Sequence, residues 1–269
     1  MSQPVALTIA GSDSGAGAGI QADLKTFAAL DVYGVTVITA ITAQNTIAVR
    51  SVQEVEPSMV GAQLDAVAED FTIAALKTGM LSSAPAIEVV AAGIRRHRLK
   101  HLVVDPVMVA KSGDRLLRED AIQALRTRLL PLAEIVTPNL PETEVLAGGP
   151  IRSLADRVSA ARTIMALGAR AVVVKGGHAD DDPVIDLLID TAGVHEFRAQ
   201  RIDTTSTHGT GCTFSAAIAA GLASGLSTHE AIARAREYVS AALGRAEPLG
   251  HGHGPLGHFV RKEPADAVH

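Results

Sequence analysis

The stretch from Val5 to Ile41, VALTIAGSDSGAGAGIQADLKTFAALDVYGVTVITAI, carries the pattern that decides the fold. Residues 5–10 read as a buried strand, and residues 11–19 form a glycine-rich loop. A helix follows, with four apolar side chains on one face: Ile20, Leu24, Phe27 and Leu30. The β-branched run at residues 35–41 predicts a second strand. The stretch therefore predicts a strand–helix–strand unit with parallel strands.

The same alternation continues to the end of the chain. Further strands are predicted at residues 73–77, 101–105, 135–137 and 171–175, with a strand pair at 184–189 and 194–197. Further helices are predicted at residues 60–71, 87–94, 122–130, 154–167 and 229–243, and one begins near residue 212. This pattern implies an α/β fold with a mainly parallel central sheet and helices on both faces. No linker or repeat interrupts it, so residues 1–269 are expected to form a single domain.

Composition excludes several classes of partner. The net charge is −5 and no long basic run occurs, which argues against binding to nucleic acid or to an anionic membrane surface. The apolar stretch at residues 216–226 is too short to span a bilayer, and the N-terminus lacks the order of a signal peptide. One cysteine cannot form an internal disulfide, which fits a reducing compartment. We therefore expect a cytoplasmic protein.

The run Thr207-His208-Gly209-Thr210-Gly211-Cys212-Thr213 is the strongest functional signal. The apolar helical pattern that follows at once places this run at the start of a helix, where free backbone N–H groups attract anions. Gly209, Thr210 and Gly211 could stabilise charge that develops during phosphoryl transfer. Cys212 in such a position is expected to have a lowered pKa and could act as a base or nucleophile. A glycine-rich helix start with a buried cysteine is the alternative.

The carboxyl ends of several predicted strands carry unusual residues, and ligands bind at those ends in such sheets. Asp105 could hold a metal, orient a hydroxyl or cap a turn. Asn139 and Glu142 could form a helix capping box, a water-mediated Mg²⁺ site, or both. Lys175 could meet a phosphate or be a solvated lysine. The glycines after the first strand favour close approach of a ligand over a plain turn, with Gly11 at the strand end.

Several motifs occur in an order that closely resembles one family. They are residues 11–17 (GSDSGAG), 42–45 (TAQN), 77–81 (KTGML), 105–108 (DPVM), 137–142 (TPNLPE), 174–178 (VKGGH) and 208–212 (HGTGC). The ordered set resembles the hydroxymethylpyrimidine/phosphomethylpyrimidine kinases of the ribokinase-like superfamily. The resemblance covers nearly the whole chain and implies a three-layer α/β fold. It also implies ATP-dependent phosphorylation of 4-amino-5-hydroxymethyl-2-methylpyrimidine and of its monophosphate, in the cytoplasmic synthesis of thiamine, by a homodimer.

The resemblance also implies roles for individual residues. Gln44 would hydrogen-bond the pyrimidine edge, in a pocket shaped by Gly11, Asp23, Met80 and Val107. The run from Gly209 to Cys212 would surround the transferring phosphoryl group. Lys175 would meet the phosphates of ATP, and Mg²⁺ would be organised by Asp105, Asn139 and Glu142.

Sugar kinases of this fold have an aspartate where Cys212 stands, and whether Cys212 is a base, a positioning group or a pocket wall stays open. Pyridoxal kinase is the alternative within the class, and a non-catalytic pyrimidine-binding regulator is the alternative of another class. A thiol-redox role is disfavoured because the chain has no second cysteine. In some relatives that also phosphorylate pyridoxal, a cysteine occupies the position of Ala110, so we expect a preference for the aminopyrimidine here.

Overall fold

The computed structural model describes residues 3–108, 119–177 and 182–260. Within these ranges, nine strands form a single sheet in the order β3-β2-β1-β4-β5-β6-β7-β8-β9. The strands are β1 (Val5–Asp13), β2 (Tyr33–Gln44), β3 (Val49–Glu54), β4 (Ile73–Thr78), β5 (Leu102–Val104), β6 (Ile135–Val136), β7 (Ala171–Val174), β8 (Val184–Ile189) and β9 (Val194–Ala199). Strands β2, β1, β4, β5, β6 and β7 run parallel. Strand β3 pairs antiparallel with β2 at one edge, and β8 and β9 extend the other edge through the antiparallel pairs β7–β8 and β8–β9.

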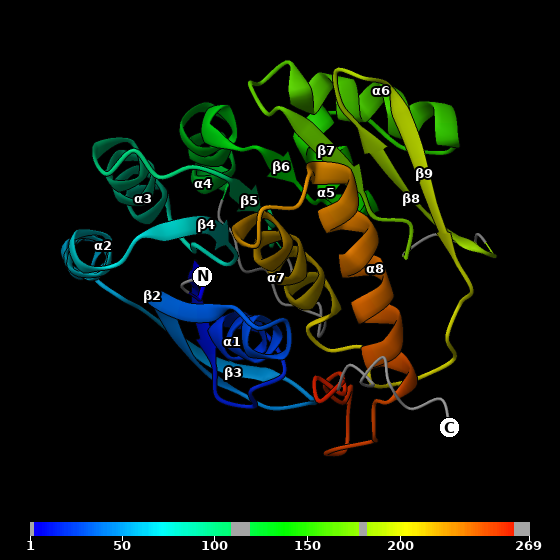
Figure 1. Ribbon diagram of the computed structural model, residues 1–269, viewed down its shortest axis with the longest axis horizontal. Coiled ribbons are helices and arrows are strands. Elements are labelled where there is room, and N and C mark those ends of the chain that lie inside the picture. The colour runs from blue at the N-terminus through cyan, green and yellow to red at the C-terminus, as the bar shows by residue number, and fades with distance from the viewer. Residues whose placement is uncertain (1–2, 109–118, 178–181, 261–269) are drawn as a thin grey trace.

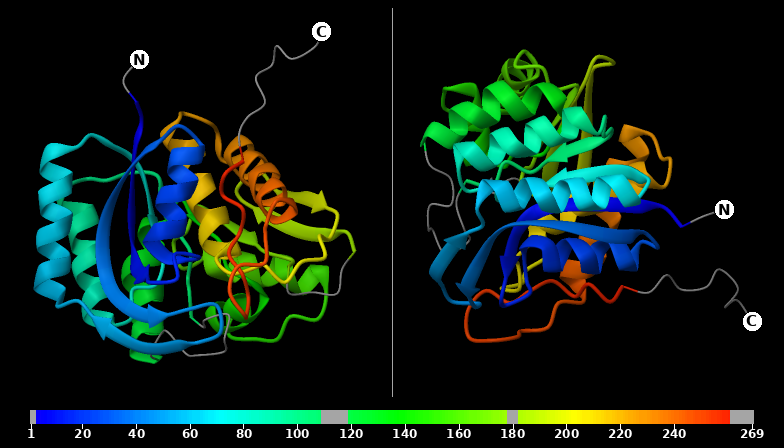
Figure 2. Two further views of the ribbon diagram at one scale, coloured as in Figure 1. Left: turned by 90° about the horizontal axis from the view of Figure 1, so that it is seen from below. Right: turned by 90° about the vertical axis from the view of Figure 1, so that its left-hand side faces the viewer.

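Helices cover both faces of this sheet, which confirms the expected three layers (Figure 1). One face carries α2 (Pro57–Asp70), α3 (Ala84–Arg96), α4 (Glu119–Ala124), α5 (Leu140–Ala147) and α6 (Leu154–Met165). The other face carries α1 (Gly19–Ala29), α7 (Thr210–Ala223) and α8 (Thr228–Gly244). Helix α7 lies between α1 and α8, and its side chains are almost all buried (Figure 2). In the described part of the chain, no helix is both long and apolar enough to cross a membrane.

Small apolar residues build both cores. The cluster under α2–α6 combines sheet residues such as Leu7 and Ile9 with Leu64 of α2. The opposite cluster joins Phe27 of α1 to the alanine-rich face of α7. Alanine lets a helix approach the sheet closely, which explains how a chain without tryptophan fills its interior.

Two local expectations were wrong, and one strand was missed. Strand β1 continues through Gly11 to Asp13, because its backbone still pairs with β2 where a loop was expected. Strand β3 was not predicted, since its side chains are nearly all exposed and give no apolar alternation. The helix expected at residues 122–130 is α4 followed by a π-helical turn (Leu125–Leu129) and a 3₁₀ turn (Leu130–Leu132), where Pro131 disfavours regular α-helix.

Candidate active site

The carboxyl ends of the parallel strands meet at one edge of the sheet, over a cavity of about 660 Å³. The start of α7 forms the opposite wall of this cavity. All but one of the residues expected in the site line it: Gly11, Gln44, Met80, Asp105, Val107, Asn139, Glu142, Lys175, Gly209, Thr210, Gly211 and Cys212. Parallel topology thus brings together the ends of six strands and the starts of two helices, α5 and α7.

The exception is Asp23, which does not line the cavity. Its carboxylate is fully buried behind β1, where both oxygens pair with Lys77 Nζ at 3.0 and 2.8 Å and Thr8 donates a hydrogen bond at 2.6 Å. Lys77 is also fully buried, and sequence reasoning did not identify it. Asp23 is therefore half of an internal ion pair rather than a pocket wall, because the side chain of Lys77 needs a buried counter-charge.

The start of α7 has the geometry of an anion site. Gly209 is its N-cap with φ of +83°, and its carbonyl accepts the N–H of Thr213 at 2.8 Å. The N–H of Thr210 donates to the carbonyl of Thr207 at 3.3 Å, whereas the N–H groups of Gly211 and Cys212 have no partner within the helix, and these residues line the cavity. The hydroxyl of Thr210 donates to the carbonyl of Thr207 at 2.7 Å, so it braces the turn. Backbone N–H groups rather than this hydroxyl are the groups available to a ligand.

The glycine loop after β1 packs against this turn. A Cβ at Gly209 would overlap the carbonyl oxygen of Gly17, and a Cβ at Gly17 would overlap the ring of His208. The two glycine-rich segments therefore touch backbone to backbone. At these positions glycine is required by contact between two parts of the chain, and not only by approach of a ligand as the sequence suggested.

Asp105 and Lys175 form an ion pair across the cavity floor. Lys175 Nζ lies 3.0 Å from Asp105 Oδ1, and Asp105 is 2% exposed. Burial opposes the charge on Lys175, but Asp105 and then Glu142 outweigh it and raise the pKa of Lys175. Lysine is therefore held charged where it can meet an anionic ligand.

Asn139 and Glu142 form the capping box expected at the start of α5. The Asn139 side chain accepts the N–H of Glu142 at 2.9 Å, and the Glu142 carboxylate accepts the N–H of Asn139 at 2.8 Å. Burial raises the pKa of Glu142 to about 7, with Asp105 adding to the rise and Lys175 opposing it. Two carboxylates thus share one cavity wall, and a bound cation would favour the charged form of Glu142.

Cys212 does not have the lowered pKa that its place in the helix suggested. Burial raises the pKa of its thiol to about 11, with Asp23 and Asp105 adding to the rise and Lys77 opposing it. Desolvation and two nearby carboxylates thus outweigh the lowering of this pKa by Lys77 and by the backbone N–H of Gly19. Cys212 is a neutral thiol in the free protein at neutral pH, which favours positioning or wall roles over a ready base.

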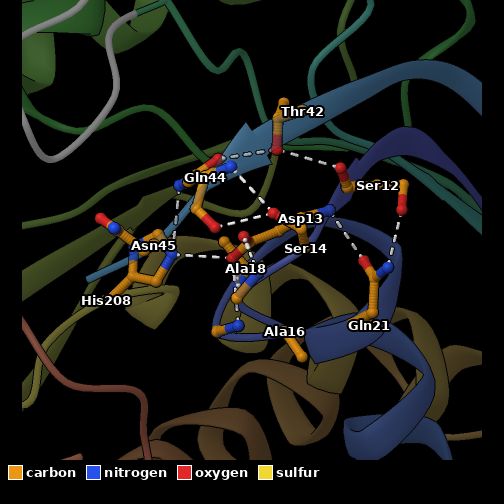
Figure 3. A network of polar contacts seen from close by, with 12 residues as sticks. Ser12, Asp13, Ser14, Ala16, Ala18, Gln21, Thr42, Gln44, Asn45 and His208 are labelled. Atoms are coloured by element: carbon orange, nitrogen blue, oxygen red, sulfur yellow. Dashed lines mark hydrogen bonds and ion pairs between the residues drawn. The ribbon is translucent and has the colours of Figure 1, made fainter. Parts of the chain in front are cut away.

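Gln44 lies at the end of β2 within a network of polar side chains (Figure 3). His208 Nε2 lies 2.9 Å from Asp13 Oδ2 and 3.3 Å from the amide nitrogen of Gln44. The amide oxygen of Gln44 lies 3.1 Å from Thr42 Oγ1. Asp13 and His208 stand inside the motifs quoted above, yet sequence alone assigned neither of them a role.

The far end of the cavity is fixed by a second ion pair that the sequence did not reveal. Arg236 of α8 donates to Asp186 of β8 at 2.6 Å, and the N–H of Gly176 donates to the same carboxylate at 2.7 Å. Asp186 thereby holds the backbone directly after Lys175. Its partners lie 10 and 50 residues away in sequence, so no local pattern signals the contact. Ala110, on which the expected substrate preference rests, lies outside the described residues.

Comparison with known proteins places this site in a family. The sequence pattern of the family described as phosphomethylpyrimidine kinase matches residues 13–257. The chain is 53% identical over 260 residues to the hydroxymethylpyrimidine/phosphomethylpyrimidine kinase of Rhizobium meliloti, covering 96% of this chain and 97% of that protein. It is also 51% identical to the thiamine biosynthesis bifunctional protein ThiED of Geobacter sulfurreducens, where 96% of this chain spans only 52% of the longer protein.

Solved structures agree in fold. The pyridoxal kinase of Bacillus subtilis, solved as an ADP complex, superposes with a TM-score of 0.89 at 42% identity and covers 96% of this chain and 98% of its own. The phosphomethylpyrimidine kinase of Clostridium difficile gives a TM-score of 0.81 at 41% identity, over 90% of this chain and all of its own. With a family pattern that spans most of the sequence and a relative more than half identical over nearly its whole length, this chain belongs to the phosphomethylpyrimidine kinase family.

Proposed function

We propose that this protein is an ATP-dependent kinase that phosphorylates 4-amino-5-hydroxymethyl-2-methylpyrimidine and then its monophosphate. The observation that carries this proposal is the placement of the helix start at Gly209–Cys212 in the same cavity as Lys175 and Gln44. The anion site and the lysine suit a triphosphate, and Gln44 suits a heterocycle with donor and acceptor groups. The single domain expected over residues 1–269 would carry both the triphosphate site and the heterocycle site. The protein would act as a cytoplasmic homodimer, as the family resemblance implies.

In this assignment the acceptor hydroxyl oxygen, or a phosphate oxygen of the monophosphate in the second reaction, attacks the γ-phosphorus of ATP while ADP leaves. The first-turn N–H groups of α7 stabilise charge on the transferring group, and Lys175 meets the phosphate oxygens. The hydroxyl proton passes to solvent as the new O–P bond forms. Cys212 lies near that path as a neutral thiol, so it positions the acceptor more readily than it removes the proton.

Mg²⁺ fits the carboxylate wall. Magnesium keeps several waters and binds through one or two carboxylates together with substrate phosphates. Asp105 and Glu142 supply two such carboxylates, while Asn139 holds Glu142 in place through the capping box. Among the described residues, no cluster of three or more metal-binding side chains is found. The ion would neutralise charge on those phosphates.

Pyridoxal kinase is the second candidate, because solved pyridoxal kinases superpose closely on this chain. A side-by-side assay separates the possibilities. The purified protein is given ATP and Mg²⁺ with the pyrimidine, its monophosphate or pyridoxal, and both ADP release and product mass are measured. We expect both pyrimidines to be phosphorylated and pyridoxal to be a poor substrate. Comparable kcat/KM for pyridoxal would refute the preference, and tight pyrimidine binding without ADP release would make the protein a binder rather than a kinase.

A further inference from the structure

The ring of His208 lies between Asp13 and Gln44, and its Nε2 would have to be protonated to hydrogen-bond one and unprotonated to hydrogen-bond the other. Its Nε2 lies 2.9 Å from Asp13 Oδ2 and 3.3 Å from the amide nitrogen of Gln44 (Figure 3). An ionised carboxylate only accepts hydrogen bonds, whereas an amide nitrogen only donates them. Nε2 can satisfy Asp13 only when it carries a proton, and it can satisfy the amide nitrogen only when it does not.

Asp13 is the stronger of these two partners for His208 Nε2. Its carboxylate accepts the N–H groups of Gly15, Gly17 and Ala18 at 2.8–3.0 Å, and it is 3% exposed. Burial opposes ionisation, but the hydrogen bonds from His208 and from the backbone hold the pKa of Asp13 below its usual value. A hydrogen bond to an ionised group is roughly twice as strong as one between neutral groups. Nε2 of His208 therefore carries its proton toward Asp13.

That proton decides which way the Gln44 amide faces. The oxygen and nitrogen of a carboxamide occupy nearly the same space, so the surrounding network fixes their order. With nitrogen toward His208, two donors would face each other. A half-turn of the amide presents its oxygen to His208 and its NH₂ to Thr42 Oγ1, whose hydroxyl then donates to the carbonyl of Ser12 at 3.1 Å. The single N–H of Nε2 is then shared between Asp13 Oδ2 and the Gln44 oxygen as a three-centre hydrogen bond, and the Gln44 NH₂ donates to Thr42 Oγ1.

We propose that the Asp13–His208 pair is a specificity-determining element that locks the Gln44 amide, and through it the face of the heterocycle that the site accepts. This inference rests on the proposed pyrimidine kinase function. The locked amide offers an acceptor at its His208 end and a donor at its Thr42 end. A 4-aminopyrimidine matches it, because its amino group donates and the adjacent ring nitrogen accepts. His208 acts through Gln44 and is a positioning residue.

The 4-oxo analogue of the substrate reverses this pattern. Its oxygen accepts and the adjacent ring N–H donates, so both contacts with a locked amide become mismatched. Turning the ring over would restore the pairs but would carry the hydroxymethyl group to the opposite side, away from the start of α7. A site with a freely rotating Gln44 amide would accept both compounds. A preference for the amino compound over the oxo compound therefore shows that the Gln44 amide is held in one orientation.

The test compares 5-hydroxymethyl-2-methylpyrimidines with a 4-amino or a 4-oxo group. The readouts are kcat/KM with ATP and Mg²⁺ and, separately, Kd by calorimetry without ATP. In the parent we expect a preference for the amino compound of about 100-fold, from roughly tenfold for each mismatched hydrogen bond. His208→Phe keeps a planar ring but no donor, and its preference should fall to about tenfold or less. His208→Gln keeps a nitrogen donor at a similar reach, and its preference should stay near that of the parent.

An unchanged preference in His208→Phe, or an equal loss in His208→Gln, would overturn the inference. Should His208→Phe fail to fold, ¹⁵N NMR of the parent gives an independent answer, with the His208 ring signal assigned by its absence in His208→Gln. A protonated Nε2 is expected, and a ring protonated at Nδ1 alone would overturn the lock. If the parent binds the amino compound selectively but never phosphorylates it, the proposed function fails while the Kd ratios still test the lock.

Discussion

Replacing Gly209 with alanine should disable the site without unfolding the protein. Gly209 has φ of +83°, where an L-residue with a Cβ is strained by about 1–2 kcal/mol. Its Cβ would also overlap the carbonyl oxygen of Gly17, so the two segments must separate by roughly 1.6 Å to reach an ordinary contact of 3.4 Å. That movement displaces the start of α7 from Lys175 and Gln44. A misplacement of only about 1 Å already costs about 100-fold in rate.

Gly225 provides a matched control. Its φ of +84° imposes the same backbone strain, but a Cβ there would meet nothing within 4 Å. Gly225→Ala should therefore lose a similar 1–2 kcal/mol, seen as a fall in Tm of about 2–4 °C per kcal/mol, with kcat close to the parent. The comparison isolates the steric contact from the strain.

The assay is steady-state ADP release at saturating ATP and pyrimidine, with Tm measured on the same preparations. Gly209→Ala should lose about 100-fold in kcat. A Gly209→Ala enzyme with near-parent kcat would show that the contact with Gly17 does not position the anion site. Equal activity losses in both variants would show that strain alone is responsible.

Three other changes test the charges and the thiol. Burial raises the pKa of Glu142 from 4.5 to about 7, so the unfolded chain releases this proton at lower pH than the folded protein, and the stability of the fold falls as pH rises between those values. Glu142→Gln should therefore have a higher Tm than the parent at pH 8 but not at pH 4. An equal Tm difference at both pH values would contradict the raised pKa. Because the pKa of Cys212 is about 11, iodoacetamide should modify this single cysteine more slowly than a free thiol at pH 7.5 and faster toward pH 10. Mass spectrometry measures the extent of modification over time. Rapid modification at pH 7.5 would show that Cys212 is an activated thiolate. Lys77→Met should cost about 3–5 kcal/mol in urea unfolding and the double variant with Asp23→Leu should recover much of it, whereas a harmless Lys77→Met would show that the buried pair is not needed.

Sequence patterns predicted the layers and the meeting point of the site because both follow from parallel topology. Asp105 and Lys175 end predicted strands and Asn139 follows one, and the carboxyl ends of parallel strands share one edge of a sheet. Hydrophobic periodicity could not reveal ion pairs between residues that are distant in the sequence. Lys77 ends an apolar strand and resembles a solvated lysine until Asp23, 54 residues away, is seen beside it.

The two glycine-rich segments explain each other in a way that neither could alone. Read separately, each looks like a loop made for a ligand. In the fold, Gly17 and Gly209 touch through their backbones, and the Asp13–His208 contact joins the same two segments. The loop after the first strand thus supports the start of α7, although 192 residues separate Gly17 from Gly209. Substrate recognition at Gln44 and charge stabilisation at α7 consequently depend on one interface, so a change in either glycine segment should disturb binding and turnover together.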